Sequence, residues 1–393
     1  MGTTKDEWNK RLEQYLELIE IPISYYEKAV QRYESLQAWF KRKASAIARY
    51  DPIVFPQGSF RLGLVIRPLT PEEEYDLDIV CQLLLLSKGD LTQRQLKELV
   101  GAEVRAYAAA HSIESPVEER KRAWRLDYAD SVKFHIDVLP CIPEDDETIR
   151  TLIEEHEVAR ELAASAAALT CKSHAQYSAI CSDWPSSNPI GFGSWFDQRM
   201  GVAALDTRMA LVRAGRYEKV EQVPLYELKT PLQRSIQILK RHRDTMFRDE
   251  PELKPISMII TTLAASAYQG ERSLHDTISG VLRRMPEHVE ASWPRVKNPV
   301  NPGEDFADKW SEKPVLEENF WMWHSQASRD MESLVKETDL KRVAALSKRS
   351  LGLSLSEAKL LDLAGVMAAS VAAVAPAVIV GRDAPKPWSN RHD

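Results

Sequence analysis

The sequence has little of what marks secreted, membrane-spanning or nucleic-acid-coating proteins. Only four of its 393 residues are cysteines, Cys81, Cys141, Cys171 and Cys181, and they form no paired framework, so free thiols in a reducing cytoplasm are expected. The first residues contain no apolar stretch of the secretory-signal type. A net charge of −6 argues against constitutive binding of long nucleic acid. We therefore expect a soluble, cytoplasmic protein.

Two local patterns could indicate a zinc site and a membrane span. Cys171, His174 and Cys181 have a spacing that offers three zinc ligands, but no fourth ligand accompanies them, and free thiols are the favoured interpretation. The apolar, alanine-rich stretch 363–380 is long enough for a membrane span, yet Pro376 interrupts it. A packed C-terminal helix, and no membrane partner, is therefore expected.

The order of hydrophobic patterns indicates how the chain is organised. Residues 4–48 have helical periodicity, and we expect Pro22 to kink or split this segment. Residues 92–110 indicate a further helix, and two segments with period-two alternation near 123–139 indicate a hairpin. Strand patterns lie at 53–55, 62–67 and 77–86. Beyond 140 the pattern is helical, with breaks that include a loop near 293–302.

These patterns predict an α+β protein of two lobes, which agrees with its length and with 44% apolar and 28% charged residues. Residues 1–50 are predicted to form a long N-terminal helix that bridges the lobes. Residues 51–150 are predicted to form a catalytic core on a small mixed sheet, and residues 151–393 a helical lobe. A ligand is expected in the cleft between the lobes.

The acidic pair in "YDLDIV" needs a compensating charge. Asp76 and Asp78 project from the same face of a predicted strand, where two carboxylates repel each other. In "SVKFHIDVLP", Asp137 projects from the polar face of another strand. If the two strands are neighbours, three carboxylates meet, and such oxygen ligands suit Mg²⁺ or Mn²⁺. Taken alone, "DLD" would indicate no more than an acidic, exposed strand face.

The upstream Gly58–Ser59 turn makes a nucleotide site the better interpretation. It follows an apolar strand and precedes the basic run "FRLGLVIR". A glycine lets the backbone approach a phosphate closely, and the Ser59 hydroxyl and N–H can donate hydrogen bonds to a triphosphate. A phosphate-binding turn followed by three carboxylates is a more specific combination than any of its parts.

Together, Gly58-Ser59, Asp76-Leu77-Asp78 and Ile136-Asp137-Val138 resemble the catalytic signature of the polymerase-β-like nucleotidyltransferases. Within that superfamily, "QGSFRLGLVIRPL" and "YDLDIVCQL" are similar to the bacterial relatives of cyclic GMP-AMP synthase and oligoadenylate synthase, the CD-NTases. The stretches "NPIGFGSWF", "TPLQRSIQILKRHRD" and "KPISMIITTLAASAY" extend the resemblance over about residues 50–270. The resemblance implies a polymerase-β-like catalytic lobe and a helical lobe that completes the nucleotide cleft.

The resemblance also implies roles for individual residues. Asp76 and Asp78 would ligate two Mg²⁺ or Mn²⁺ ions, and Asp137 would bind the catalytic ion and activate the attacking hydroxyl. The residues implied to bind the substrate triphosphate are Gln57, Gly58, Ser59, Lys240 and Ser257. The sequence departs from the family in Leu64, where related enzymes often have threonine, and in the lengthened "PLTPEEE" hairpin.

Several of these positions also have a plainer interpretation. Lys240 would fit a solvated helix face, together with Arg241 and Arg243, and Ser257 would fit a helix N-cap. The segment of Asn188, Gly191 and Trp195 indicates either a loop over the cleft or a turn followed by core aromatics.

The implied reaction joins NTPs, ATP among them, into a cyclic di- or trinucleotide second messenger with release of pyrophosphate, in bacterial anti-phage (CBASS) signalling. Regulatory proteins of the same defence operon are candidate partners, and a monomer is expected. No zinc-thumb spacing is present, so no activation by DNA is expected. The same aspartates would serve an enzyme that modifies an RNA 3′ end or a protein hydroxyl, which stays open as the alternative. A catalytically inactive scaffold is disfavoured by the intact residues.

Overall fold

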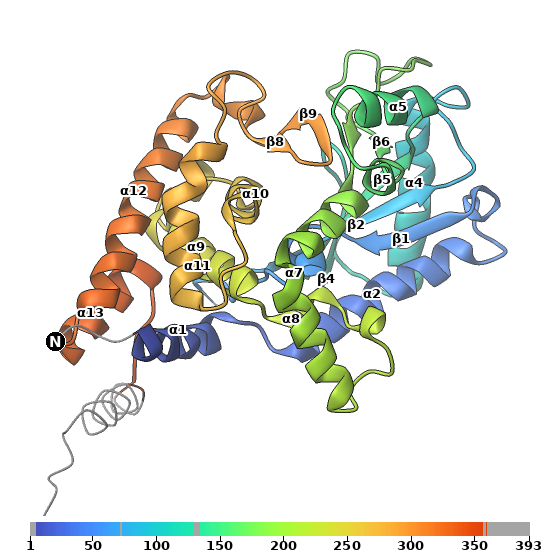
Figure 1. Cartoon of the computed structure of the whole chain (residues 1–393). Coiled ribbons are helices and arrows are strands. Elements are labelled where there is room, and N and C mark those ends of the chain that lie inside the picture. The colour runs from blue at the N-terminus through green and yellow to red at the C-terminus, as the bar shows by residue number, and fades with distance from the viewer. Residues whose placement is uncertain (1–4, 71–72, 129–133, 357–358, 360–393) are drawn as a thin grey trace, which may run out of the picture.

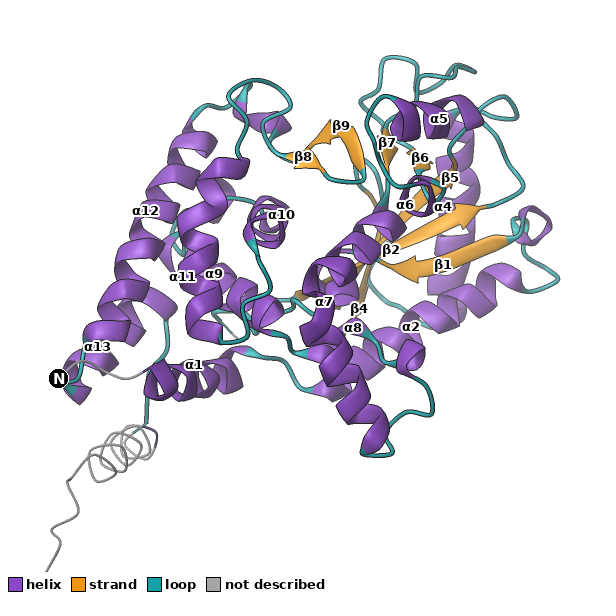
Figure 2. Ribbon diagram, in the orientation of Figure 1, coloured by secondary structure: helices purple, strands orange, loops and turns teal. Residues whose placement is uncertain are grey.

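A computed structural model describes residues 5–70, 73–128, 134–356 and 359 (Figure 1). The described chain forms a mixed β-sheet and a body of helices that lie beside each other (Figure 2). Each part has its own large hydrophobic core. The predicted C-terminal helix at 363–380 lies outside the described residues. Within those residues, no helix is both long and apolar enough to cross a membrane.

The N-terminal region consists of two helices, so the prediction of one long helix that spans both lobes is wrong. Helix α1 (Lys5–Ile19) ends before Pro22, and α2 (Ile23–Lys41) begins directly after it. Pro22 has φ −58° and ψ 145°, an extended conformation that interrupts the helical hydrogen bonds. Helix α1 packs into the helical core, and α2 packs into the core beneath the sheet.

The sheet places two strands that are distant in sequence next to each other. Its main order is β1 (Pro52–Pro56), β2 (Tyr75–Leu83), β5 (Phe134–Pro143), β4 (Trp124–Tyr128) and β3 (Glu118–Glu119). The short β6 (Ala167–Leu169) pairs with β5, and β7 (Ser186–Ser187) pairs with β6. Only β2 and β5 are parallel, and α4 (Gln93–Ala110) lies in the connection that such a pair requires. The buried face of β2 and β5 packs against α2 and α4.

The segment 62–67 was predicted to be a strand, and the structure shows that this prediction is wrong. Residues Gly58–Leu62 form the short helix α3, and the following residues are extended but pair only once, where Ile66 bridges Glu20. The carbonyl groups of this segment are instead hydrogen-bonded by side chains of α9 (Pro231–Met246). The bonds run from Gln233 to Leu62, from Gln237 to Val65, from Lys240 to Leu64 and from Arg241 to Arg67.

The helical body is arranged around α9, which contacts α1, α10, α11, α12 and α13. The other α-helices are α5 (Asp146–Glu154), α6 (Arg160–Ala163), α7 (Pro189–Arg213), α8 (Leu225–Leu228), α10 (Ser257–Ala267), α11 (Leu274–Arg284), α12 (Val315–Lys336) and α13 (Leu340–Leu351). Short 3₁₀ helices lie at Ala48–Tyr50, Val220–Gln222, Pro251–Leu253, Met285–His288 and Asp308–Trp310.

A small hairpin occupies most of the segment that was predicted to be a loop near 293–302. Its strands are β8 (Lys297–Asn298) and β9 (Asn301–Asp305). Strand β9 contacts β7 at the edge of the main sheet, so the hairpin connects the helical body with the catalytic side of the sheet (Figure 2). The sequence signal was weak here because both strands are short and the segment contains prolines and a glycine.

Candidate active site

The three predicted carboxylates lie on one patch of the sheet. In the parallel pair of β2 and β5, Asp78 lies directly opposite Asp137, and Asp76 is two residues earlier on the same face. Leu77 and Ile136 point to the other face and are buried in the core. The alternation of apolar and acidic residues therefore anchors both strands and presents the acids together.

The proximity of these acids has an electrostatic cost. Burial, together with the nearby carboxylates of Asp137 and Asp76, raises the pKa of Asp78 to about 7. Arg125 on β4 lies opposite Asp137 in the antiparallel register and partly compensates this charge. Its Nε and Nη2 donate to the two oxygens of Asp137 at 2.8 and 2.7 Å, and Nη2 lies 3.4 Å from Asp76 Oδ1. These contacts raise the pKa of Arg125.

The donor set fits a hard divalent cation by its charge and its oxygen atoms. It is not assembled around one point, however. In the part of the chain that the structure describes, no three His, Cys, Asp or Glu side chains converge into a ready metal-ligand group. Each oxygen of Asp137 accepts one hydrogen bond from Arg125, so a cation that used all three aspartates would compete with this guanidinium for the carboxylate. Arg125 was not predicted, although period-two alternation along "AWRLDYAD" places it on a definite face of its strand.

Gly58 and Ser59 begin α3 beside the carboxylates, rather than forming the predicted tight turn. The N–H of Gln57 donates to the Asp78 carbonyl at 2.8 Å. Gly58 has φ +62°, and a Cβ atom at this position would lie 2.9 Å from Asp78 Oδ2. Only glycine allows the chain to turn this close to the acidic strand.

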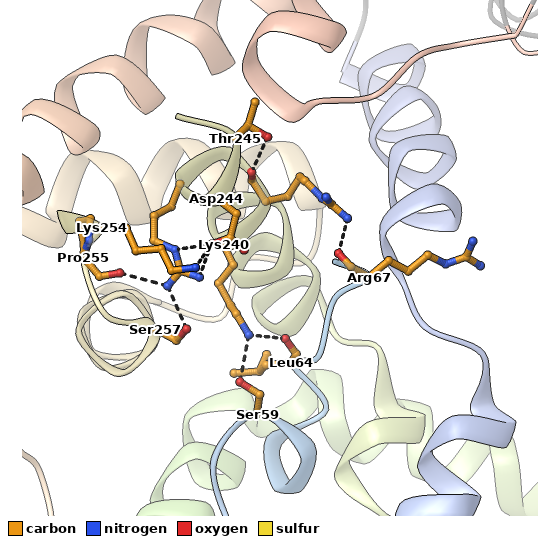
Figure 3. Close-up of polar contacts among 11 residues, drawn as sticks. Ser59, Leu64, Arg67, Lys240, Asp244, Thr245, Lys254, Pro255 and Ser257 are labelled. Atoms are coloured by element: carbon orange, nitrogen blue, oxygen red, sulfur yellow. Dashed lines mark hydrogen bonds and ion pairs between the residues drawn. The ribbon is translucent and has the colours of Figure 1, made fainter. Parts of the chain in front are cut away.

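Lys240 joins the two lobes at this point, and its interpretation as part of a solvated helix face is wrong. The residue is only 5% exposed. Its Nζ donates to Ser59 Oγ at 2.9 Å and to the Leu64 carbonyl at 2.7 Å (Figure 3). Burial, together with the positive charge of Arg243, lowers the pKa of Lys240 to about 7.

Ser257 is the first residue of α10, and Ile256 is the N-cap, so the interpretation of Ser257 as an N-cap is also wrong. Its Oγ accepts a hydrogen bond from Arg243 Nη1 at 2.9 Å (Figure 3). Arg241 and Arg243 are both buried rather than solvated. Arg243 also bonds Asp244 and the Pro255 carbonyl, so it positions the start of α10.

Comparisons with known proteins agree with this arrangement. Residues 52–140 match the family described as "Cyclic GMP-AMP synthase DncV-like, nucleotidyltransferase domain". The chain is 27% identical over 358 residues to a c-di-GMP synthase of Roseivirga ehrenbergii, covering 89% of this chain and 86% of that protein. It is 24% identical over 318 residues to the cyclic dinucleotide synthase CdnG of Bradyrhizobium diazoefficiens, covering 77% and 70%.

Solved structures show the same fold. The complex of the Bradyrhizobium diazoefficiens CD-NTase CdnG with GTP has a TM-score of 0.64 at 20% identity, and the match covers 92% of this chain and 99% of that one. The Vibrio cholerae dinucleotide cyclase DncV, in a mutant form with ATP, GTP and 5MTHFGLU2, has a TM-score of 0.59 at 13% identity, with the same coverage. The chain is therefore a nucleotidyltransferase that is similar to the CD-NTases over most of its length.

Asp76 and Asp78 open into a cavity of about 360 Å³ between the sheet and the helical body. This volume lies within the range of roughly 300–1,000 Å³ that is common for small-molecule sites. At one end the cavity is lined by Gln57, Gly58, Ser59, Asp76, Asp78 and Ser257. At the other end it is lined by Arg122, Ser187, Asn298, Glu304 and Phe306. This second group was not predicted, because hairpin β8–β9 was not recognised.

The segment of Asn188, Gly191 and Trp195 is the start of α7 and not a loop over the cleft. Asn188 is the N-cap, and its Oδ1 accepts a hydrogen bond from the Gly191 N–H at 2.9 Å. Trp195 packs on Phe192, as expected for a core aromatic. Asn188 still contributes to the cavity, since its side chain lines the wall.

The candidate zinc ligands do not line the cavity, and their side chains make separate contacts. Cys171 Sγ lies 3.3 Å from Ser173 Oγ, whereas Nδ1 of His174 bonds the side chain of Gln93. Cys181 contacts the Asp183 carbonyl at 3.4 Å. All four cysteines are free thiols, as predicted.

Proposed function

We propose that this nucleotidyltransferase joins two nucleoside triphosphates into a cyclic dinucleotide second messenger and releases pyrophosphate. The observation that carries the proposal is that Asp76 and Asp78 line one cavity with Gly58 and Ser59, while Asp137 lies directly opposite Asp78 on the neighbouring strand. Both curated relatives are named as synthases of cyclic dinucleotides, which favours a dinucleotide over a larger ring. We further propose a role in bacterial anti-phage (CBASS) signalling, in line with the resemblance.

The phosphate end of the cavity is built to receive a polyanion. Ser59 lines the cavity, and Lys240 Nζ lies behind it, 2.9 Å from the Ser59 hydroxyl, so a phosphate group bound at Ser59 would lie close to the lysine. A triphosphate beside Lys240 would raise its pKa and favour the charged ammonium form. Ser257, held in place by Arg243, would add a further hydroxyl.

Asp76, Asp78 and Asp137 would hold the divalent ions, which neutralise charge on the phosphates and lower the pKa of the attacking ribose hydroxyl when they are bound. Asp137 lies opposite Asp78, where it can orient that hydroxyl once Arg125 has released it. The work of the protein is thus positioning and electrostatic stabilisation.

The proposal is tested by incubating the purified protein with all four NTPs and Mg²⁺ or Mn²⁺. We expect pyrophosphate and phosphatase-resistant small nucleotides, which mass spectrometry identifies. The double variant Asp76→Asn/Asp78→Asn should release no pyrophosphate, whereas Asp249→Asn, at an exposed position outside the cavity, should retain the activity.

Undiminished pyrophosphate release by the double variant would refute the carboxylate assignment. Transfer of label from NTP to added RNA or to protein, with no cyclic product, would instead support the alternative that the enzyme modifies an RNA 3′ end or a protein hydroxyl.

A further inference from the structure

The end of the cavity opposite the phosphate-binding residues contains a carboxylate whose position is fixed. Glu304 on β9 accepts two hydrogen bonds at its Oε2, from Asn298 Nδ2 and from Ser187 Oγ, both at 2.8 Å. Asn298 is 1% exposed and Ser187 9% exposed, so both donors are held by their surroundings. All three residues line the cavity that also contains Asp76 and Asp78.

The second oxygen of Glu304, Oε1, receives no hydrogen bond from the residues that the structure describes. Burial, together with the nearby carboxylate of Asp308, raises the pKa of Glu304 above its usual value, and the two hydrogen bonds to Oε2 and the positive charge of Arg122 offset part of this rise by stabilising the ionised form. An ionised carboxylate accepts hydrogen bonds and donates none. An ionised Glu304 therefore calls for hydrogen-bond donors on a ligand at this end.

The surrounding walls suit a flat, apolar ring. Phe306 and Phe192 line the same part of the cavity and pack edge to face, with ring centroids 5.9 Å apart. Leu139 and Leu169 line it from the sheet. Aromatic side chains stack on nucleobases with a gain that does not depend strongly on the base. The walls thus favour a base, and Glu304 selects which one.

Among the four bases, only guanine presents two adjacent donors on its Watson–Crick edge, N1–H and the 2-amino group. In adenine and cytosine the amino group lies next to a ring nitrogen that accepts hydrogen bonds, and in uracil a single N–H lies between two carbonyl groups. A carboxylate facing those edges would meet an unpaired acceptor, which is unfavourable in a desolvated site. Arg122 offers donors that match the guanine acceptors O6 and N7.

We propose that Glu304, fixed by Ser187 and Asn298, is a specificity-determining residue that selects guanine, so that GTP is a substrate of this enzyme. This inference rests on the proposed function, since it assigns the base of a nucleotide whose phosphates lie at the carboxylate end. A CdnG complex with GTP and a relative named c-di-GMP synthase are consistent with it but do not locate the base.

The test compares GTP with ITP, which lacks the 2-amino group of guanine and is otherwise identical. Dissociation constants are measured by titration calorimetry with Mg²⁺ in an Asp137→Asn background, so that turnover does not consume the nucleotide. We expect GTP to bind about tenfold to a hundredfold more tightly than ITP, which corresponds to one hydrogen bond to a charged group. Glu304→Gln should reduce this ratio to about threefold or less, because its carboxamide presents a donor.

Glu290→Gln is the matched control. It is the same substitution in the same region, at a side chain that is 53% exposed and lies outside the cavity. It should leave the ratio of GTP to ITP affinity unchanged. Melting temperatures of all variants separate loss of recognition from loss of folding. If Glu304→Gln unfolds, the comparison of GTP with ITP in the Glu290→Gln protein still decides the point, because there only the ligand changes at this site.

The outcomes separate this inference from the proposed function. Equal affinities for GTP and ITP, or an unchanged ratio in a folded Glu304→Gln protein, would show that Glu304 merely ties β7 to β9 and would overturn the inference. Cyclic products without guanosine would overturn it too, while the proposed function would stand. Selective GTP binding without any cyclic product from the wild-type protein would support the assignment of Glu304 and refute the proposed synthesis of a cyclic dinucleotide.

Discussion

Replacing Gly58 with alanine is expected to disable the carboxylate site while leaving the protein folded. Gly58 has φ +62°, and a Cβ added there would lie 2.9 Å from Asp78 Oδ2, closer than real Cβ atoms approach other atoms. Asp78 sits in the middle of the acidic patch, directly opposite Asp137. The added methyl group therefore changes the geometry of the proposed metal ligands.

The magnitude follows from two contributions. A residue with a Cβ in the left-handed conformation costs about 1–2 kcal/mol of stability. To restore ordinary van der Waals contact, the distance must increase from 2.9 Å to at least 3.4 Å, so either Asp78 or the start of α3 has to move. A misplacement of about 1 Å at a catalytic centre can cost about 10²-fold in rate. We expect a fall of about 10- to 100-fold in pyrophosphate release.

Gly215→Ala is the control for this experiment. Gly215 has φ +72°, but a Cβ there would meet no atom within 4 Å. Both variants should lose similar stability in urea unfolding, and only Gly58→Ala should lose activity. If the two variants retain the same rate of pyrophosphate release, the close approach of Gly58 to Asp78 has no functional meaning and the reasoning is refuted.

Two further predictions concern the charged residues around the site. Arg125→Gln should lower the melting temperature in EDTA, because Asp137 loses hydrogen bonds between charged groups worth about 1.5–3 kcal/mol each. The variant should also be stabilised more by Mn²⁺ than the wild-type protein is, because Arg125 no longer competes for Asp137. Equal Mn²⁺-induced shifts of the melting temperature in both proteins would contradict this prediction. Burial is the main cause that lowers the pKa of Lys240 from 10.5 to about 7. Between these pH values the unfolded chain carries a proton that the folded protein lacks. The free energy of unfolding should therefore rise with pH in this window because of Lys240. Lys240→Met should flatten that rise in urea unfolding, and an unchanged pH profile would show that the lysine is not buried in solution.

The acidic patch could be predicted because it depends on local alternation. Asp76, Asp78 and Asp137 each follow a period-two pattern with the buried residues Leu77, Ile79, Ile136 and Val138. That β2 and β5 are neighbours could only be assumed, since the pairing depends on a crossover through α4. Arg125 follows the same alternation on β4, so its face was predictable, whereas its contact with Asp137 depends on the register of a hairpin.

Lys240 illustrates what local patterns do not show. The run of lysine, arginine and histidine at the end of α9 is typical of a solvated face, yet residues 232–243 are almost all buried. Their polar groups are paired with partners far away in the sequence, and the Lys240–Ser59 contact spans 181 residues. A helix in the centre of a helical body buries every face, so amphipathic periodicity no longer reports which side is exposed.

The contacts of α9 also explain how one site is shared by two hydrophobic cores. Gln233, Gln237, Lys240 and Arg241 follow the i, i+4, i+7, i+8 spacing of one helix face, and each donates a hydrogen bond to a carbonyl of segment 62–67. This segment continues directly from α3, which carries Gly58 and Ser59 beside the carboxylates. Lys240 thus belongs to a row of side chains that attaches the phosphate-binding segment of the sheet lobe to the helical body. Because these carbonyls are bonded by side chains of α9 and not by a strand, any shift of α9 relative to the sheet would move Ser59 as well. The two lobes must therefore be correctly packed before the phosphate end of the cavity can form.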